Sequence, residues 1–234
     1  LTYEPAVAAM RARGAEVITV SLDGGGIDVE DVAATCRRRR VRAIFVTPHH
    51  QFPTTVVMRT ERRLRLVELA RQHGFAIIED DYDHEFHFDG QPHLPIAAYA
   101  PGQVIYVGSM SKLLLPSLRI GFAVAPKAVI DAIAHHVSLT DGMGNPIEEE
   151  AVAHLIAAGE LQRHVRNARQ IYAERRAAFA GHLDAVFGDR VAYRAPEGGL
   201  AFWLRFHADI NSLEERAAAA GLLFASSQSY RQRN

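Results

Sequence analysis

The sequence predicts an α/β fold in which a mostly parallel sheet is sandwiched between helices. Over the first part of the chain, short apolar runs rich in β-branched residues alternate with segments whose apolar residues recur at helical spacing. This order of strands and helices is typical of a parallel sheet with helices on its faces. In addition, acidic and hydroxyl side chains follow two of the apolar runs, at the strand ends where such sheets bind ligands.

The first predicted elements are a helix at 5–13 and a strand at 16–20. A glycine-rich turn at 23–26 follows, and Asp28 is placed to cap a helix that continues through Arg38. Four more strands and one more helix complete this part: strands at 41–47, 75–78, 104–107 and 120–125, and a helix capped by Thr60, with Leu64, Val67, Leu69 and Ala70 on its inner face.

After Pro146 the sequence becomes mainly helical. A long helix is predicted at about 160–187, with apolar residues at helical spacing: Leu161, Val165, Ala168, Ile171, Tyr172, Phe179, Leu183 and Val186. Shorter elements are predicted after it: strands at 190–193 and 200–206 around a hairpin-like loop at 196–199, a helix at 213–220 and a strand at 222–225. We therefore expect a large domain at 1–158 and a smaller, C-terminal α+β domain at 159–234.

The composition indicates an ordinary globular protein. Of the 234 residues, 48% are hydrophobic and 23% are charged, and the net charge of −1 provides no overall attraction for nucleic acid. The arginine run at 37–40 is interpreted as a solvated helix end. Cys36 is the only cysteine, which excludes an internal disulfide and is compatible with a reducing cytoplasm. Because no apolar run approaches the ~20 residues of a membrane helix, we expect a cytoplasmic protein without membrane contact.

A lysine with nearby hydroxyls follows the strand at 104–107. Its amine, at the rim of an apolar sheet, is expected to be desolvated, which would lower the pKa of Lys112 and allow it to form a Schiff base with an aldehyde. The hydroxyls of Ser109 and Ser111 and the guanidinium of Arg119 are suited to a phosphate beside it. An aldehyde together with a phosphate describes pyridoxal phosphate, although an isolated Ser-x-x-Lys is common by chance.

Acids and a tyrosine follow the strand at 75–78. Pyridoxal chemistry requires a carboxylate against the ring nitrogen, because the protonated pyridinium is the electron sink. A phenol hydrogen-bonded to the 3-oxygen of the ring is also useful. Asp80 and Tyr82 are two residues apart and would point the same way on an extended segment. These two residues are therefore predicted to contact the cofactor ring.

Taken together, these segments identify a family resemblance over nearly the whole chain. The chain resembles the aminotransferase-like domain of the MocR subgroup of GntR-type bacterial transcription regulators. That domain is similar to the class I/II aminotransferases, which have the fold type I of pyridoxal-phosphate enzymes. The resemblance rests on residues 46–54, 78–86 and 106–121, with a looser match at 159–176.

The resemblance implies a role for each matching residue. Lys112 would form the internal aldimine, Asp80 would pair with the pyridine nitrogen, and Tyr82 would contact the 3-oxygen. The predicted phosphate ligands are Ser109 and Arg119, with Ser111 as a weaker candidate, and the second-tier site residues are His49, His50 and Gln51.

The chain departs from the ordinary enzymes in one segment. Many aminotransferases have Asn-Pro-Thr-Gly, in which the asparagine also touches the 3-oxygen, whereas this chain has Phe52-Pro53-Thr54-Thr55. The Gln-Phe-Pro form is typical of the MocR-type domains. We therefore expect a domain that senses an amine or amino acid as a homodimer and reaches DNA only through a domain absent from this chain.

Some parts of a complete pocket are not recognisable in the sequence. The chain starts at Leu1 without a methionine, and no Ser/Gly-rich phosphate-binding segment precedes Tyr3. Near the other end, no motif around Arg231 or Arg233 matches the arginine that binds a substrate carboxylate in the family. We therefore expect a fragment with an incomplete pocket.

Three other functions stay open at this point. A genuine aminotransferase would use the same Lys112 to move a proton. A Ser-x-x-Lys acyl hydrolase would use Ser109 as its nucleophile. Such enzymes also carry Ser-Asp-Asn and Lys-Thr-Gly motifs, and this sequence contains neither. A metal site is disfavoured because His84 and His87, three residues apart, would face opposite ways on an extended stretch. The residues considered for such a site are Asp81, His84, His87 and Asp89, and we expect no metal.

Overall fold

A four-stranded sheet lies at the centre of the first half of the chain in the computed structural model, which describes residues 2–90, 93–142, 144–207 and 212–230. Its order is β3-β4-β5-β6, in which β3, β4 and β5 are parallel and β6 is antiparallel to β5. The predicted α/β fold with a mostly parallel sheet is therefore confirmed. The strands are β3 (Ala43–Val46), β4 (Ala76–Asp81), β5 (Val104–Ser109) and β6 (Gly121–Val124).

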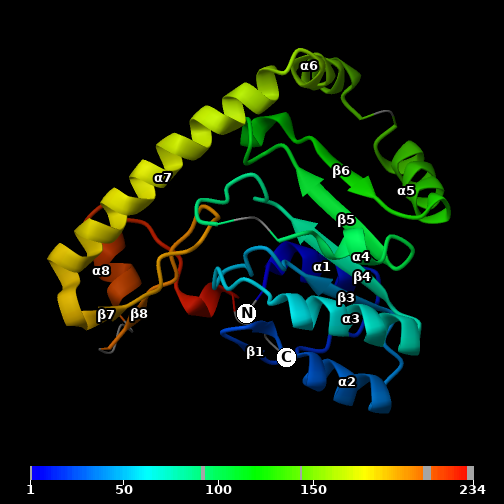
Figure 1. Cartoon of the computed structure of the whole chain (residues 1–234), viewed down its shortest axis with the longest axis horizontal. Helices are drawn as coiled ribbons and strands as arrows, with labels where there is room; N and C mark the ends of the chain where they lie inside the picture. Colours follow the sequence, from blue (N-terminus) through cyan, green and yellow to red (C-terminus); the bar gives the residue numbers. More distant parts are fainter. Residues whose placement is uncertain (1, 91–92, 143, 208–211, 231–234) are drawn as a thin grey trace.

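Helices α2 (Val29–Arg38), α3 (Thr60–His73) and α4 (Ile96–Tyr99) cover one face of this sheet. Their apolar side chains form one core with the strands, in which Leu66 of α3, Ile77 of β4 and Ile96 of α4 are fully buried. Asp28 caps α2 as predicted, because its carboxylate accepts from the backbone N–H groups of Glu30 and Asp31. Figure 1 shows α2 and α3 on one side of the sheet, while α7 runs past the other side.

The remaining elements lie around this core (Figure 1). Before the sheet come α1 (Glu4–Ala12) and a two-stranded hairpin of β1 (Leu22–Asp23) and β2 (Gly26–Ile27). After it come α5 (Lys127–Thr140), α6 (Pro146–Ala157) and α7 (Glu160–Phe187), then β7 (Val191–Ala192) paired with β8 (Arg205–Phe206), and α8 (Leu213–Ala219). Single 3₁₀ turns occur at Pro116–Leu118, Gly188–Arg190 and Ser227–Tyr230.

Helix α6 ends at the predicted domain boundary. Gly159 adopts a left-handed φ of 71° between α6 and α7, a conformation that glycine reaches without a Cβ penalty. The division into domains at 1–158 and 159–234 stays a prediction. Arg231 and Arg233 lie outside the described residues. Among the described helices, none is both long and apolar enough to cross a bilayer.

Several local predictions are wrong. Residues 16–20 and 222–225 form no strand, and each of these segments exposes large apolar side chains. Apolar alternation allows a strand but does not provide a neighbouring strand with which to pair. Thr60 is the first residue of α3 rather than its cap, which is Arg59, and Leu64 is exposed instead of facing the core.

The apolar stripe of α7 is buried only in part. Leu161, Val165 and Leu183 are buried, whereas Ile171, Phe179 and Val186 keep about half of their surface exposed. The predicted inner face is therefore correct at the ends of the helix and incomplete along its length.

Candidate functional site

The parallel strands β4 and β5 end at the same edge of the sheet and bring two predicted site residues together. In the register of the two strands, Asp80 lies beside Val107, which is two residues before Ser109. Because side chains alternate along a strand, Asp80 and Ser109 point to the same face of the sheet. The neighbouring Glu79 and Asp81 point to the opposite face, toward α3 and α4. The predicted carboxylate and phosphate ligands thus share one face at one edge.

The loop after β5 places the other predicted phosphate ligands near Ser109. The Met110 N–H donates to the Ile120 carbonyl over 3.0 Å, which closes the loop at its base, one residue from Arg119. The Ser111 N–H donates to Ser109 Oγ over 3.2 Å. The Ser109 hydroxyl therefore keeps its own proton free to donate to an anion. Arg119 has a left-handed φ of 52° and an exposed side chain.

Lys112 lies in a turn of this loop and is exposed. The prediction that its amine is desolvated is therefore wrong for this structure, because Lys112 follows the end of β5 by three residues instead of standing at the buried rim of the sheet. Helix α7 holds the loop in place, since Nε2 of His164 donates to the Leu113 carbonyl over 2.9 Å.

Tyr82 is the first residue of a turn after β4, so the prediction that it points the same way as Asp80 along an extended segment rests on a wrong premise. Its hydroxyl donates to the His50 carbonyl over 3.1 Å. The edge of its ring meets Phe52 with the centroids 6.0 Å apart, and Phe52 in turn contacts the rings of Tyr3 and Tyr230. Burial and the nearby Asp83 raise the pKa of Tyr82, so the phenol stays protonated.

The carboxylate of Asp80 is half-buried and has no cationic partner among the described residues. Burial, together with the negative charges of Asp81 and Asp83, raises the pKa of Asp80 to about 6. A carboxylate in such surroundings would be stabilised by a positively charged group on its own face of the sheet.

The second-tier candidates fall into three separate arrangements. Gln51 supports its own loop, where its side-chain amide donates to the Phe52 carbonyl and accepts from the Thr54 N–H. His50 pairs with Asp83, since Nδ1 lies 2.8 Å from Oδ1 and both side chains are 1% exposed. This pair was not predicted, although the adjacent histidines before a proline are a visible signal.

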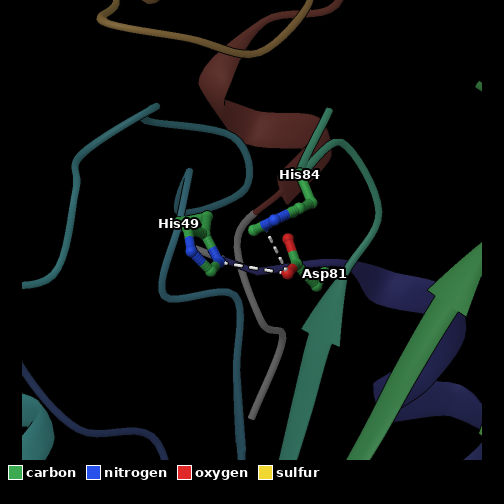
Figure 2. Close-up of side chains that lie close together, drawn as sticks. All are labelled: His49, Asp81 and His84. Atoms are coloured by element: carbon green, nitrogen blue, oxygen red, sulfur yellow. Dashed lines mark ion pairs between the residues drawn. The ribbon is translucent and has the colours of Figure 1, made fainter. Parts of the chain in front are cut away.

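His49 belongs to a cluster with Asp81 and His84 (Figure 2). The turn after β4 folds His84 back over the strand end, so Nδ1 of His84 and Nδ1 of His49 each lie 3.1 Å from Oδ2 of Asp81. Burial opposes the charge of Asp81, but the two imidazoles more than offset this and lower its pKa below the ordinary value. The same contact with Asp81 raises the pKa of His84.

The extended stretch assumed for this segment is therefore incorrect. His84 reaches Asp81, whereas His87 stacks on His50 with the ring centroids 6.3 Å apart, and Asp89 pairs with Arg176. Of the four residues considered for a metal site from sequence, Asp81 and His84 are therefore in contact, while His87 and Asp89 contact other residues.

Two buried charged residues that support the site were not predicted. Arg63 of α3 has no exposed surface and donates to the backbone carbonyls of Met58, Leu94 and Pro48. Glu79 of β4 is equally buried and accepts from the N–H groups of Ile96 and Ala97, at the start of α4. Each lies within a run of charged residues in the sequence, and the spacing of such a run does not predict which side chain is buried.

Comparison with known proteins relates this arrangement to two groups. The chain is 34% identical over 205 residues to the probable rhizopine catabolism regulatory protein MocR of Rhizobium meliloti, covering 87% of this chain and 41% of that protein. It is 29% identical over 237 residues to aromatic-amino-acid aminotransferase 1 of Thermococcus litoralis, covering 98% of this chain and 57% of that protein. The chain thus spans about half the length of these relatives.

Solved aminotransferases have the same fold. The kynurenine aminotransferase of Pyrococcus horikoshii superposes with a TM-score of 0.88 at 29% identity, over 96% of this chain and 57% of that chain. LysN, an alpha-aminoadipate aminotransferase of Thermus thermophilus solved with N-(5′-phosphopyridoxyl)-L-leucine, has a TM-score of 0.88 at 27% identity, over 95% of this chain and 59% of that chain.

The family match covers almost the entire chain. Residues 1–227 match the family model described as aminotransferase class I and II. The chain therefore belongs to the class I and II aminotransferase family, whose fold type I architecture it has, and its relatives include helix-turn-helix regulators such as MocR as well as aminotransferases.

Proposed function

We propose that this chain is the pyridoxal-phosphate-binding, effector-sensing part of a MocR-type transcription regulator. It would hold the cofactor at Lys112 and respond to an amine or amino acid, while DNA would be bound by another part of the protein. The family supports dependence on pyridoxal phosphate, and several relatives are named as helix-turn-helix regulators.

The residues at the sheet edge fit this cofactor. Asp80 is a half-buried carboxylate that lacks a cation among the described residues, and a protonated ring nitrogen on its face of the sheet would supply one. Ser109 and Arg119, at the base of the next loop, offer a hydroxyl and a guanidinium to a phosphate. When bound, the cofactor supplies an electrophilic aldehyde and an electron-withdrawing ring.

The chain's own residues would then position and hold the cofactor. The amine of Lys112, exposed on its loop, is accessible to an aldehyde placed over the strand ends. Ser111 contributes its backbone N–H to the orientation of Ser109 and is a weaker phosphate ligand. The protonated phenol of Tyr82 provides a hydrogen-bond donor beside the ring, although it donates to the His50 carbonyl here and would have to exchange that partner.

The observation that most favours a sensor is the position of Phe52. Where many family enzymes place an asparagine amide, this chain places an apolar ring against Tyr82 and Tyr230. The 3-oxygen of the cofactor would therefore lose one polar contact and depend on Tyr82. In a sensor, the amine needs only to bind one conformation of the protein more tightly than another. This does not require the contacts that a full catalytic cycle needs.

A titration of the intact protein with amino acids tests the sensor. After loading with pyridoxal phosphate, an effector should shift the visible absorption spectrum and change the affinity for operator DNA. Keto-acid product should form far below the rate of a transaminase, which is typically on the order of 1–1000 per second. Steady transamination at such rates, with no effect of the amine on DNA binding, would support the alternative, a genuine aminotransferase.

Replacement of Asp80 by alanine should weaken the binding of pyridoxal phosphate. The lost charge-assisted hydrogen bond to the ring nitrogen is worth about 1.5–3 kcal/mol. Equilibrium titration followed by cofactor fluorescence would measure this change. Asp81→Ala is the matched comparison, because Asp81 is adjacent in β4 but points to the opposite face. A larger loss of affinity in Asp81→Ala would mean that the wrong acid has been assigned to the ring.

We also propose that the protein works as a homodimer. Ile171, Phe179 and Val186 of α7, and Phe122 and Val124 of β6, each keep a large part of their apolar surface exposed. Exposed large apolar side chains are frequent at protein interfaces, and most oligomers of identical chains are symmetric dimers. Sedimentation of the intact protein would measure its oligomeric state.

A further inference from the structure

We propose a divalent metal site, suited to Zn²⁺, formed by His49, Asp81 and His84. These residues come from different segments: the loop after β3, the last residue of β4 and the turn that follows it (Figure 2). One potential ligand atom from each lies within 4.8 Å of the other two. Two imidazoles and one carboxylate are a frequent zinc ligand set, in which a fourth position is left to water.

The two imidazole nitrogens approach the same oxygen of Asp81 closely, as ligands of one ion would. Nδ1 of His49 and Nδ1 of His84 each approach Oδ2 of Asp81 to 3.1 Å, yet neither nitrogen has a hydrogen-bond partner, because the geometry is not aligned. Tetrahedral zinc with bonds of about 2.0–2.2 Å separates its ligand atoms by roughly 3.3–3.5 Å. A small shift of the side chains would therefore accommodate the ion.

Burial leaves one oxygen of the cluster, Oδ1 of Asp81, available to a cation. The side chain of Asp81 has no exposed surface and that of His49 is 5% exposed, yet Oδ1 of Asp81 has no hydrogen-bond partner in the described part of the chain. A buried carboxylate with an unused oxygen is costly unless it is paired or binds a metal. His84 is 34% exposed, so it provides the route by which an ion would enter.

The surrounding residues orient the proposed ligands. Nε2 of His49 lies 2.6 Å from the His93 carbonyl and donates to it, which leaves Nδ1 as the lone pair that faces the cluster in the neutral ring. The hydroxyl of Tyr106 donates to Oδ2 of Asp81 over 2.8 Å. Such outer hydrogen bonds from a ligating histidine to a carbonyl, and to a ligating carboxylate, are a regular feature of protein metal sites.

The proposed site is distinct from the proposed cofactor site. Asp81 and Tyr106 lie side by side on the face of the sheet that α3 and α4 cover, whereas Asp80 and Ser109 lie on the opposite face. A bound ion would connect the loop after β3 to the turn that begins with Tyr82. Zinc would thereby stabilise the segment that presents Tyr82, and this structural role does not depend on the regulator function.

Equilibrium dialysis of the intact protein against buffered ZnCl₂, with the bound metal measured by mass spectrometry, tests the site. The wild-type protein should bind one zinc ion more than His84→Ala, with an affinity at least about 100-fold higher at that site. His87→Ala is the matched control, because it lies in the same segment, is also half-buried and takes no part in the cluster. This control should retain the wild-type stoichiometry.

A second variant separates ligation from general loss of structure. Tyr106→Phe keeps the ring and removes only the hydroxyl that orients Asp81, so zinc affinity should fall by about 10- to 100-fold while the thermal unfolding of the metal-free protein stays nearly unchanged. Co²⁺ in place of Zn²⁺ should give visible absorption bands that His84→Ala lacks. Equal zinc binding by the wild-type protein and His84→Ala would overturn the proposal.

Discussion

Replacement of Lys112 by alanine should abolish covalent attachment of pyridoxal phosphate. Only a primary amine can hold the aldehyde covalently, so the expected effect is complete loss rather than weakening. Treatment of the loaded protein with borohydride, followed by digestion and mass spectrometry, should find the reduced adduct on Lys112 in the wild-type protein and none in Lys112→Ala.

The sequence makes this experiment unusually direct, because the chain contains only two lysines. The second, Lys127, is at the start of α5, where its amine lies 2.7 Å from the carboxylate of Asp131. Lys127→Ala therefore serves as the matched control and should keep the adduct. An adduct on Lys127 in the wild-type protein, or one that persists in Lys112→Ala, would contradict the assignment of Lys112.

Exposure of Lys112 adds a condition to this result. In this structure the amine is not desolvated by the chain itself, so attachment depends on the cofactor being held first by its other contacts. Asp80→Ala and Lys112→Ala should therefore affect cofactor binding in different ways. The first should lower the affinity for the cofactor, whereas the second should leave some non-covalent binding but no adduct.

The sheet could be predicted because its strands are continuous apolar runs. Residues 104–107 and 75–78 are buried on one face of the sheet or half-buried on the other, so none of them is fully exposed, and strands shielded on both faces are apolar throughout. Both strands nevertheless extend further than predicted, to Ser109 and Asp81, because backbone pairing with a neighbour continues into polar residues. Pairing also explains why residues 16–20 are not a strand, since they join none of the sheets formed by the described residues.

The sequence predicts which side chains gather at one edge of the sheet, but it does not predict how the turns orient them. The strand ends at Asp80 and Ser109 could be inferred from the rule that ligands bind at one edge of a parallel sheet. The turn that begins at Tyr82 could not, because its direction depends on tertiary contacts such as the hydrogen bond to the His50 carbonyl. The extended stretch assumed for His84 and His87 failed for the same reason, because the turn brings His84 back to Asp81.

Replacement of Arg63 by methionine should lower the free energy of unfolding by about 3–5 kcal/mol, because it breaks a buried charged network. Arg63 has no exposed surface, and its guanidinium donates to the carbonyls of Met58, Pro48 and Leu94 at 2.7–3.0 Å. Methionine has a similar length but no donor, so three backbone carbonyls, two of them on buried residues, would lose the guanidinium that bonds to them. Urea unfolding of the intact protein would measure the change.

Two further variants test whether the loss of stability comes from the buried hydrogen bonds of Arg63. Arg65→Met removes a guanidinium from the same helix that contacts only exposed carboxylates, those of Glu30 and Glu68, and it should leave the urea midpoint nearly unchanged. Arg63→Lys keeps the charge but cannot reach three carbonyls with a rigid fork, so its stability should fall between the wild type and Arg63→Met. Equal stability of Arg63→Met and the wild type would show that water replaces the guanidinium.

Arg63→Met should also weaken cofactor binding. Arg63 holds the Pro48 backbone, and the loop that follows contains Phe52 and the His50 carbonyl to which Tyr82 donates.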